Sequence, residues 1–464
     1  MSENFARLLD RSARLAPGAP ALVWDGGALT WAALDLRAGG VARALSAQGV
    51  RARDRVVLAM ANGWRFVAAL WGALKVGATV SPLNPLLAGE ERMRIVADLR
   101  PAAIVEETGA DEAVVASVEG TRAPALILYT SGSTGEPKGV VLSHAALTFA
   151  NRSWIGPVMG LTAEDVVLAA LPLSHSFGLN GALLAPLLAG ASVALLDHFS
   201  PEAALSAIAQ HRVTVFPGVA AMFRRMLDAP AMATADLGSL RAVVSGAAPC
   251  PWELAREWRE RTGVRIIRGY GSTELFRPIS HLAGDPCDEP ESVGRPVPGV
   301  EIAVVDDAGA ALPQGEVGEL WIRTPAAMEG YLDRPEETRA VLADGWFRTG
   351  DLVTVSPDGH VSIVGRKREL ILRGGYSVVP AEVEAVLLAH PAVAEAAVVG
   401  LPHPELGEEV AAFVTLRPGA ASDPAELIAH CKARLAGFKY PRQVQIVAQL
   451  PKSATGKILK SRLR

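Results

Sequence analysis

The sequence predicts an α/β protein with a large N-terminal domain, residues 1–366, and a small α+β C-terminal domain, residues 367–464. Helical stretches alternate with short apolar runs from residue 29 onward, and the sequence pattern changes near residue 293 and again after residue 366. Such an alternation favours layered, mostly parallel sheets covered by helices. With 464 residues, of which 50% are hydrophobic, the chain is long enough to bury a sizeable core.

The first elements alternate between helix and strand. Residues 29–45 and 65–74 have the apolar spacing of helices, whereas residues 55–60 and 77–82 resemble buried strands. Further strand-like runs cover residues 125–129, 192–196, 213–216 and 242–245. Short apolar runs separated by helical patterns are typical of parallel sheets.

The C-terminal third has shorter elements. Glycine and proline recur from about residue 293 to 366, which predicts a β-rich subdomain of the N-terminal domain. A basic stretch at residues 366–369 marks the predicted domain boundary. Pro380 occupies the first position of a predicted helix that continues to residue 390. Two strands, residues 393–399 and 410–416, and a helix from about residue 422 to 435 follow.

Composition and charge exclude several classes of protein. The formal net charge is −4, so the chain has no global basic field for nucleic acid or an anionic membrane. Cys250, Cys287 and Cys431 lack metal-ligand spacing. Residues 1–17 are too charged for a signal peptide, and residues 179–196 are interrupted by Asn, Gly and Pro, so we expect them to be buried rather than membrane-spanning. We expect a cytoplasmic protein, and the sequence leaves a homodimer open.

A loop rich in glycine and hydroxyl groups follows the apolar run at residues 125–128. Residues 129–139 read YTSGSTGEPKG. Glycines let backbone N–H groups converge on an anion, the hydroxyls add donors and Lys138 adds a cation, which suits a polyphosphate. An isolated loop of this kind is more often a solvated turn. The loop lacks the Gly-Lys-Ser/Thr ending of a P-loop, and the chain has no Gly-x-Ser-x-Gly elbow of a serine hydrolase.

Six further motifs follow the loop in a fixed order. Residues 171–178, 245–249, 269–274, 346–351, 365–369 and 451–457 read LPLSHSFG, SGAAP, GYGSTE, WFRTGD, GRKRE and PKSATGK. This ordered set resembles the adenylate-forming superfamily, which includes acyl-CoA and aryl-CoA ligases, peptide-synthetase adenylation domains and luciferases. The resemblance extends from about residue 29 to the last residues.

The resemblance implies an ATP- and Mg²⁺-dependent acid–thiol ligase. A carboxylate is a poor electrophile, so a fatty or aromatic acid is first joined to AMP, which is a good leaving group, and the acyl group is then passed to coenzyme A. A carrier protein or an amine is the alternative acceptor. An inactive nucleotide-binding homologue is the rival interpretation, and the residues that argue against it are Lys457, Glu274, Asp351 and Thr130.

The resemblance also assigns residues to the nucleotide. Lys457 matches the lysine that bridges the carboxylate and the α-phosphate, and Glu274 the glutamate that holds Mg²⁺. Tyr270 offers its ring to the adenine, and Asp351 accepts hydrogen bonds from the ribose. The catalytic set is Lys457, Glu274, Thr130 and His175. The nucleotide-binding set is Ser131, Gly132, Ser133, Thr134, Gly135, Lys138, Gly246, Ala247, Ala248, Tyr270, Gly271, Ser272, Thr273, Asp351 and Arg366.

For the acid, the resemblance implies a pocket of small and apolar groups. Its wall is formed by His175, Phe177, Gly181, Val219, Gly269 and Gly271. His175 is similar to a histidine that gates or orients the acid rather than acting as a general base. Arg277 is less usual at its position, because it would either meet a polar substituent of the acid or face solvent, and solvent is slightly favoured.

The C-terminal domain is expected to rotate between the two half-reactions. The pivot position falls on Arg368, and Gly374 and Gly375 would line the channel for coenzyme A. Two residues depart from the usual pattern, since Ser377 stands where many relatives have Asn and Glu369 where many have Asp. Neither departure removes a predicted catalytic group.

Overall fold

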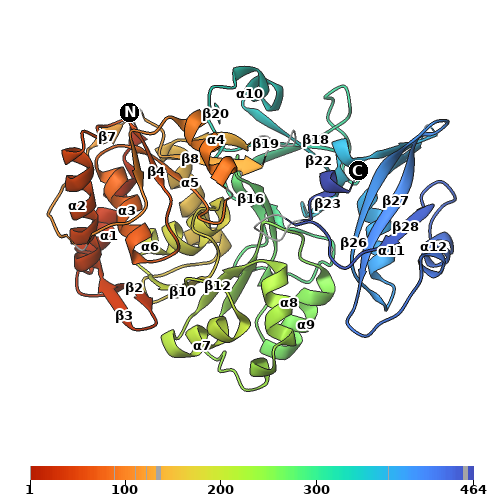
Figure 1. Ribbon diagram of the computed structural model, residues 1–464, viewed down its shortest axis with the longest axis horizontal. Helices are drawn as coiled ribbons and strands as arrows, with labels where there is room; N and C mark the ends of the chain where they lie inside the picture. Colours follow the sequence, from red (N-terminus) through yellow and green to blue (C-terminus); the bar gives the residue numbers. More distant parts are fainter. Residues whose placement is uncertain are drawn as a thin grey trace. The chain divides into compact units, whose positions relative to one another are not determined.

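The computed structural model divides the backbone into two compact units (Figure 1). It describes residues 2–87, 89–109, 111–121, 123–131, 137–374, 376–452 and 458–463. The first unit comprises Met1–Glu301 and Ile322–Phe347, and the second comprises Ile302–Trp321 and Arg348–Arg464. The predicted boundary between residues 366 and 367 lies inside the second unit and stays a prediction.

A seven-stranded sheet forms one half of the core of the first unit. Its strand order is β14-β13-β12-β10-β11-β2-β3, and all neighbouring pairs are parallel except the hairpin of β2 and β3. The bounds are Pro20–Trp24 (β2), Gly27–Thr30 (β3), Val166–Ala169 (β10), Ser192–Leu195 (β11), Val215–Gly218 (β12), Ala242–Ser245 (β13) and Ile266–Ile267 (β14). The residues of β11, β12 and β13 are all buried, as their apolar sequences predict.

A second, six-stranded sheet of this unit has the order β20-β9-β8-β5-β4-β6. The bounds are Arg55–Leu58 (β4), Thr79–Pro82 (β5), Ala103–Val105 (β6), Leu126–Ser131 (β8), Pro137–Leu142 (β9) and Gly330–Tyr331 (β20). β4, β5, β6 and β8 are parallel, whereas β9 turns back along β8 and β20 adds antiparallel to β9. A short pair, β1 (Ser2–Glu3) with β7 (Gly120–Thr121), stands apart.

Helices cover these sheets, and α1, α2 and α3 lie side by side (Figure 1). The bounds are Phe5–Leu15 (α1), Trp31–Ala47 (α2), Trp64–Lys75 (α3), Gly89–Leu99 (α4), His144–Ser153 (α5), Ala185–Ala189 (α6), Pro201–His211 (α7), Ala220–Asp228 (α8), Trp252–Thr262 (α9) and Pro335–Val341 (α10), with π-helical turns at Trp154–Val158 (η1) and Gly178–Leu184 (η2) and a 3₁₀ turn at Pro230–Ala233 (η3). α2 begins two residues later than predicted, because residues 27–30 pair with β2 and the hydroxyl of Thr30 accepts a hydrogen bond from the Ala33 N–H, which caps the helix.

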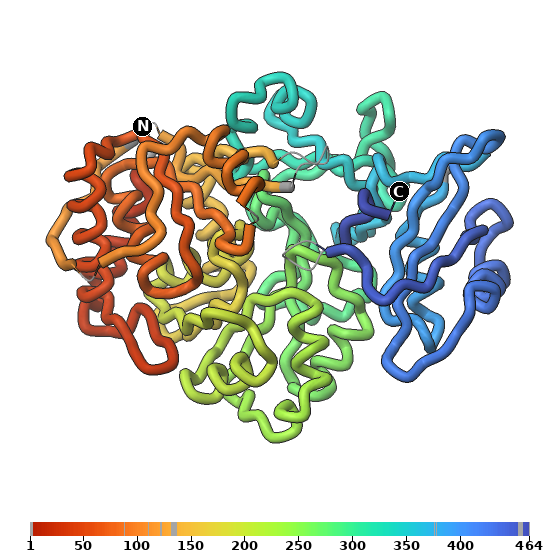
Figure 2. Tube along the Cα trace, viewed as in Figure 1, coloured from red at the N-terminus to blue at the C-terminus, as the bar shows by residue number. Residues whose placement is uncertain are grey.

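The second unit contains a compact α+β core. The strands are Ile371–Arg373 (β24), Tyr376–Val378 (β25), Val393–His403 (β26), Gly407–Leu416 (β27) and Gln443–Ile446 (β28), with helices Pro380–Leu388 (α11) and Pro424–Lys432 (α12) and 3₁₀ turns Lys367–Glu369 (η4) and Lys460–Arg462 (η5). The two predicted strands are longer than expected and form one hairpin, β26 with β27, which Figure 2 traces in blue. Val383, Leu387 and Leu427 of the helices pack on this sheet.

Residues 293–366 are rich in strands, and the two units share them. They contain β17 (Arg295–Pro296), β18 (Glu301–Val305), β19 (Gly318–Arg323), β20, β21 (Leu342–Ala343), β22 (Trp346–Val355) and β23 (Val361–Arg366), together with α10. β18, β19, β22 and β21 form one sheet, with β23 beside β22. The predicted α/β class is therefore confirmed.

The apolar stretch at residues 179–196 is buried inside the first unit. It forms η2, α6 and β11, and Leu179, Leu183 and Leu187 are almost fully buried. Among the described residues, none of the helices combines the length and apolar character needed to cross a membrane.

A buried histidine at the start of α5 makes the stability of the fold depend on pH. The Nδ1 atom of His144 accepts a hydrogen bond from the Phe5 N–H, and the side chain is fully buried. Burial lowers the pKa of His144 from 6.5 to about 4. Between these values the unfolded chain binds a proton that the folded chain does not, so stability falls as the pH falls.

We expect His144→Gln to weaken this dependence by up to about 1.4 kcal/mol per pH unit. The measurement is the fall in melting temperature between pH 7 and about pH 5, which should be smaller in the variant than in the wild type. The exposed His198→Gln is the matched control and should retain the wild-type fall. If the melting temperature of the His144 variant fell as much as that of the wild type, His144 would not be the cause of the pH dependence.

Candidate active site

The hairpin of β8 and β9 frames the glycine- and hydroxyl-rich loop. In its register Thr130 lies opposite Lys138, and Ser131 lies opposite Pro137. The loop residues predicted to contact the nucleotide, Gly132, Ser133, Thr134 and Gly135, lie outside the described residues. The hairpin therefore places Thr130 and Lys138 opposite each other on the two strands that flank the loop.

Lys138 belongs to a small cluster of charges. Its ammonium forms an ion pair with Glu337, in the first turn of α10, and lies 5.4 Å from the centroid of the Tyr331 ring. Arg334 forms a second ion pair with Glu337, at 3.0 Å. Both cations lower the pKa of the Glu337 carboxyl, which stays ionised. Two cations thus share one carboxylate.

Glu274 lies at the tip of a second hairpin and is joined to the first one through Tyr331. The hairpin consists of β15 (Gly269–Ser272) and β16 (Phe276–Ser280). The Tyr331 hydroxyl donates a hydrogen bond of 3.0 Å to Oε1 of Glu274, and Tyr331 itself pairs with Val140 of β9. An ionised carboxylate has several acceptor sites, so Glu274 can hold this bond and still offer oxygen to a hard cation such as Mg²⁺. The predicted metal-binding glutamate and the predicted phosphate-binding lysine therefore contact the same tyrosine.

The backbone around the predicted adenine contacts is tightly constrained. A Cβ atom at Gly271 would lie 1.8 Å from the carbonyl oxygen of Phe276, so the hairpin requires glycine there. Phe276 and Ala247 have φ values of 55° and 63°, which are uncommon for residues with a side chain. Ala247 belongs to the SGAAP turn after β13. Strain of this kind often clusters at functional sites.

Predicted pocket and nucleotide-binding residues follow the ends of neighbouring parallel strands. Val219 comes directly after β12, Gly246 directly after β13, and Gly269 two residues after β14. The carboxyl ends of adjacent parallel strands meet at one edge of the sheet, where ligands bind in open α/β folds. Ala248, Tyr270 and Thr273 lie in the same segments, and the Thr273 hydroxyl is 3.4 Å from that of Ser176. The structure therefore brings the HSF, SGAA and GYGSTE motifs together.

His175 lies in this group as a partly buried, neutral side chain. Its Nδ1 atom accepts a hydrogen bond from the Phe177 N–H at 3.2 Å. Burial lowers the pKa of His175 to about 4, so the ring carries no charge at neutral pH. A neutral imidazole suits the orienting role that the sequence predicts.

Sequence reasoning missed Trp154, which packs against the predicted pocket wall. The Trp154 ring lies 5.7 Å from that of Phe177, and a Cβ atom at Gly181 would lie 2.9 Å from it. Trp154, Phe177 and Val219 share one apolar cluster. Trp154 begins the π-helical turn η1 and belongs to none of the motifs. The one sequence signal for a role in the pocket is a large aromatic residue at the end of an apolar helix.

The expectation that Arg277 faces solvent was wrong. Its side chain is buried, with 7% relative exposure, because every residue of β16 is buried. Its guanidinium donates hydrogen bonds to the carbonyl oxygens of Ser245 and Ile267. These carbonyls stand at the carboxyl ends of β13 and β14, so Arg277 reaches the edge of the sheet where the pocket residues lie.

In the second unit, two predicted nucleotide-binding residues form an ion pair. Asp351 and Arg366 lie opposite each other on β22 and β23, and Arg366 Nε is 2.9 Å from Asp351 Oδ1. Asp351 is buried, which fixes its carboxylate. A buried and oriented acceptor of this kind suits the two hydroxyls of a ribose.

The predicted hinge and channel residues have different surroundings. Arg368 is exposed, whereas its neighbours Lys367 and Glu369 form ion pairs with Glu319 and with Lys460. Gly374 has a φ of 57°, and its N–H donates to the Leu406 carbonyl. Lys457 and Gly375 lie outside the described residues, and so do the side-chain contacts of Ser131 and Ser377.

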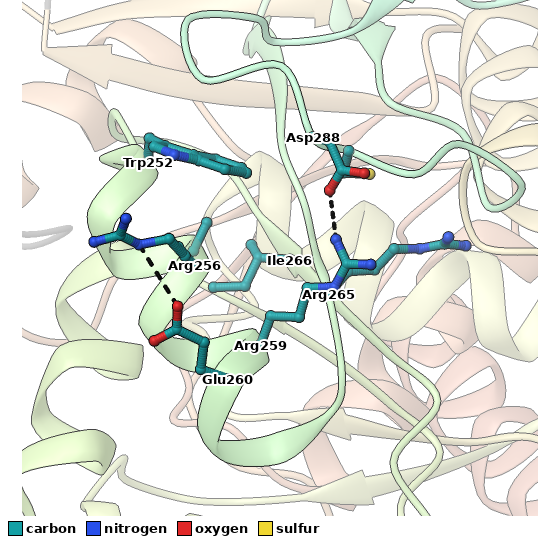
Figure 3. A pocket seen from close by; sticks show the side chains of 9 residues that line it. Trp252, Arg256, Arg259, Glu260, Arg265, Ile266 and Asp288 are labelled. Carbon is teal, nitrogen blue, oxygen red and sulfur yellow. Dashed lines mark hydrogen bonds and ion pairs between the residues drawn. The ribbon is translucent and has the colours of Figure 1, made fainter.

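A surface cavity of about 430 Å³ lies beside α9 (Figure 3). It contains none of the predicted site residues. Two of its three arginines are compensated, because Arg256 pairs with Glu260 and Arg259 pairs with Asp288, whereas Arg265 donates to the Ala283 carbonyl. The ion pairs therefore offset most of the positive charge that the cavity offers to an anionic ligand.

Comparison with known proteins relates this arrangement to a family. The model of the AMP-binding enzyme family matches residues 9–123 and 107–332, and that of the AMP-binding enzyme C-terminal domain matches residues 382–457. Feruloyl-CoA synthase of an Amycolatopsis species is 36% identical, over 98% of this chain and 97% of the relative. Indoleacetate–CoA ligase of Aromatoleum aromaticum is 34% identical, over 99% and 98%.

A solved structure agrees with these relatives. ATP-bound MatB from Rhodopseudomonas palustris superposes with a TM-score of 0.92 at 32% identity, over 99% of this chain and 98% of that chain. The family models, the full-length relatives and the fold thus point to the same group of enzymes. The chain belongs to the AMP-binding enzyme family, the adenylate-forming superfamily that the order of its seven motifs predicted.

Proposed function

We propose residue roles for the reaction of this enzyme, an AMP-forming ligase that activates a carboxylic acid as its acyl-adenylate and transfers the acyl group to coenzyme A. The observation that carries the proposal is the cluster of Glu274, Tyr331 and Lys138 at the hairpin that frames the polyphosphate loop. The family and its CoA-ligase relatives support ATP and coenzyme A as co-substrates. These co-substrates in turn support the predicted cytoplasmic location.

In this proposal Lys138, Thr130 and the loop residues bind the β- and γ-phosphates. The ammonium of Lys138 lies on the strand that follows the loop, and a cation there favours a bound anion. Glu274 is the ligand for Mg²⁺, which neutralises phosphate charge when bound. Tyr331 is a positioning residue, because its hydroxyl holds the Glu274 carboxylate in place.

The adenosine is held by the small residues Gly246, Ala247 and Ala248, by the ring of Tyr270 and by Asp351 with Arg366. Lys457 supplies the cation at the α-phosphate, where charge accumulates during adenylation. The part that moves between the half-reactions is residues 367–464, with Arg368 as its hinge and Gly374 and Gly375 along the path of the thiol. The exposed side chain of Arg368 between two ion-paired neighbours supports this assignment.

The acid is proposed to be compact, with an aromatic acid as the first candidate. The rings of Trp154 and Phe177 and the side chain of Val219 form an apolar wall, and the buried guanidinium of Arg277 lies against Gly269. A long alkyl chain has no polar group to meet that cation. The feruloyl and indoleacetate relatives support an aromatic ring. A carrier protein or an amine as acceptor remains the alternative to coenzyme A.

Lys457→Ala tests the proposed division of labour between the half-reactions. We expect acid-dependent exchange of labelled pyrophosphate into ATP to fall on the order of a hundredfold to a thousandfold, because the cation at the α-phosphate is lost. Formation of the thioester from a supplied acyl-adenylate and coenzyme A should be retained. The control is Lys452→Ala, which removes an ammonium that pairs with Glu395. An equal loss of both half-reactions in a folded Lys457 variant would contradict the proposed role.

Tyr331→Phe tests whether Tyr331 positions the proposed metal ligand. Removing the hydroxyl that holds Glu274 should raise the Mg²⁺ concentration for half-maximal exchange by about tenfold, the lower end of typical effects for groups that orient ligands. Glu274→Gln should raise it further. Tyr440→Phe, whose ring lies under Arg442 in the second unit, is the control. An unchanged Mg²⁺ requirement in the Tyr331 variant would show that the hydroxyl does not position Glu274.

A panel of acids tests the proposed substrate class. Aromatic acids of one or two rings should support faster pyrophosphate exchange than dodecanoate or hexadecanoate at equal concentration, because the wall around Trp154 and Arg277 suits a compact body. Release of AMP with formation of a thioester should then require coenzyme A. Faster exchange with the long-chain acids would overturn the compact-acid proposal, and release of AMP with an amine alone would overturn coenzyme A as the acceptor.

A further inference from the structure

Arg277 is a buried cation whose described partners are all neutral. Nε donates to the Ser280 hydroxyl at 3.0 Å, Nη1 to the Ser245 carbonyl at 2.8 Å and Nη2 to the Ile267 carbonyl at 3.1 Å. A guanidinium has five N–H donors, so two of them have no acceptor within the described part of the chain. The side chain is therefore fixed in position while retaining donors for a ligand.

No carboxylate compensates this charge among the described residues. The one described titratable group that affects the pKa of Arg277 electrostatically is the Cys287 thiol. Burial raises the pKa of this thiol to about 11, so it is neutral at pH 7. Burial lowers the pKa of Arg277 to about 9, which still leaves the guanidinium charged at neutral pH. By contrast, the buried Lys75 is paired with both Asp10 and Asp35. A buried charge without a counter-charge is costly, and a bound anion would offset that cost.

The guanidinium lies at the wall of the proposed acid pocket. A Cβ atom at Gly269 would lie 2.3 Å from Nη2, and one at Gly246 would lie 3.2 Å from Nη1. The guanidinium carbon is 5.1 Å from the centroid of the Trp154 ring, and Trp154 in turn contacts Phe177 and Gly181. The absence of side chains at Gly246 and Gly269 is what lets the cation approach the backbone on both sides.

We propose that Arg277 is a specificity-determining residue that binds an anionic substituent at the far end of the acid, so that the substrate is a compact acid with a second carboxylate or an equivalent anionic group. The inference rests on the proposed function, because it places the acid against Trp154 and Phe177 and beside Gly269. A planar carboxylate matches the two parallel N–H donors of a guanidinium. The apolar rings of Trp154 and Phe177 then cover the body of the acid between its two charged ends.

The test compares acids that differ only in the second charge. Benzoate is paired with its 1,3- and 1,4-dicarboxylate analogues, and pentanoate with pentanedioate, in acid-dependent pyrophosphate exchange. The wild type should favour one of the dicarboxylates over its neutral-tailed partner by on the order of thirtyfold or more in kcat/KM, as expected for a buried charge pair. Arg277→Met should abolish or reverse this preference through KM for the acid, with KM for ATP unchanged. Arg277→Lys, which retains the charge, should keep part of the preference.

A matched control separates recognition from a structural role. Arg268 is also buried, and it donates to the carbonyls of Glu289 and Pro290, so Arg268→Met should lower the rates with both acids of a pair alike. The same uniform loss in Arg277→Met would show that Arg277 only ties the strands together and would overturn the inference. Exchange by the wild type with neutral-tailed acids and no preference for a second charge would also overturn it, while leaving the ligase activity in place. If no acid supported exchange, the proposed function itself would fail.

Discussion

The hydroxyl of Tyr331 and its ring face join the two hairpins on which the candidate active site depends. The hydroxyl donates to Glu274 at the tip of the β15–β16 hairpin, and the ring lies beside the ammonium of Lys138 on β9. Because β20 pairs directly with β9, the tyrosine cannot move without breaking backbone hydrogen bonds of the six-stranded sheet. The position of a carboxylate is therefore set by sheet register rather than by a flexible loop, which is the kind of support that a metal ligand needs.

The residues proposed to contact the acid and the adenine depend on the seven-stranded sheet. β12 and β13 are buried along their whole length, and β12 ends directly before the proposed pocket residue Val219, whereas β13 ends directly before the proposed nucleotide-binding residue Gly246. The burial that stabilises the sheet thus also aligns the segments that follow it. The positive φ of Ala247 and the close approach of Gly271 to Phe276 show that the turns after these strands have little freedom. A rigid sheet edge with constrained turns is a suitable base for orienting a small acid against a nucleotide.

The side chain of Arg277 has two effects on the residues around it. It satisfies the carbonyl groups of Ser245 and Ile267 at the ends of two buried strands, and it introduces a charge into an otherwise apolar wall. The first effect stabilises the sheet edge. The second has an electrostatic cost, because no carboxylate compensates the charge within the described part of the chain.

The sequence by itself determined the α/β class, most of the strands and the membership of the family, and it indicated the segments of the candidate site. These features follow from residue order alone: β11, β12 and β13 are apolar runs of strand length, and the seven motifs come in one order along the chain. Only the tertiary structure decided the pairing of β20 with β9, the contact of Tyr331 with Glu274, the place of Trp154 and the burial of Arg277. The physical reason is that each of these joins residues far apart in the chain, and an arginine near a motif carries no local signal that tells solvent from interior. Its burial follows from the packing of β16, which no single stretch of sequence specifies.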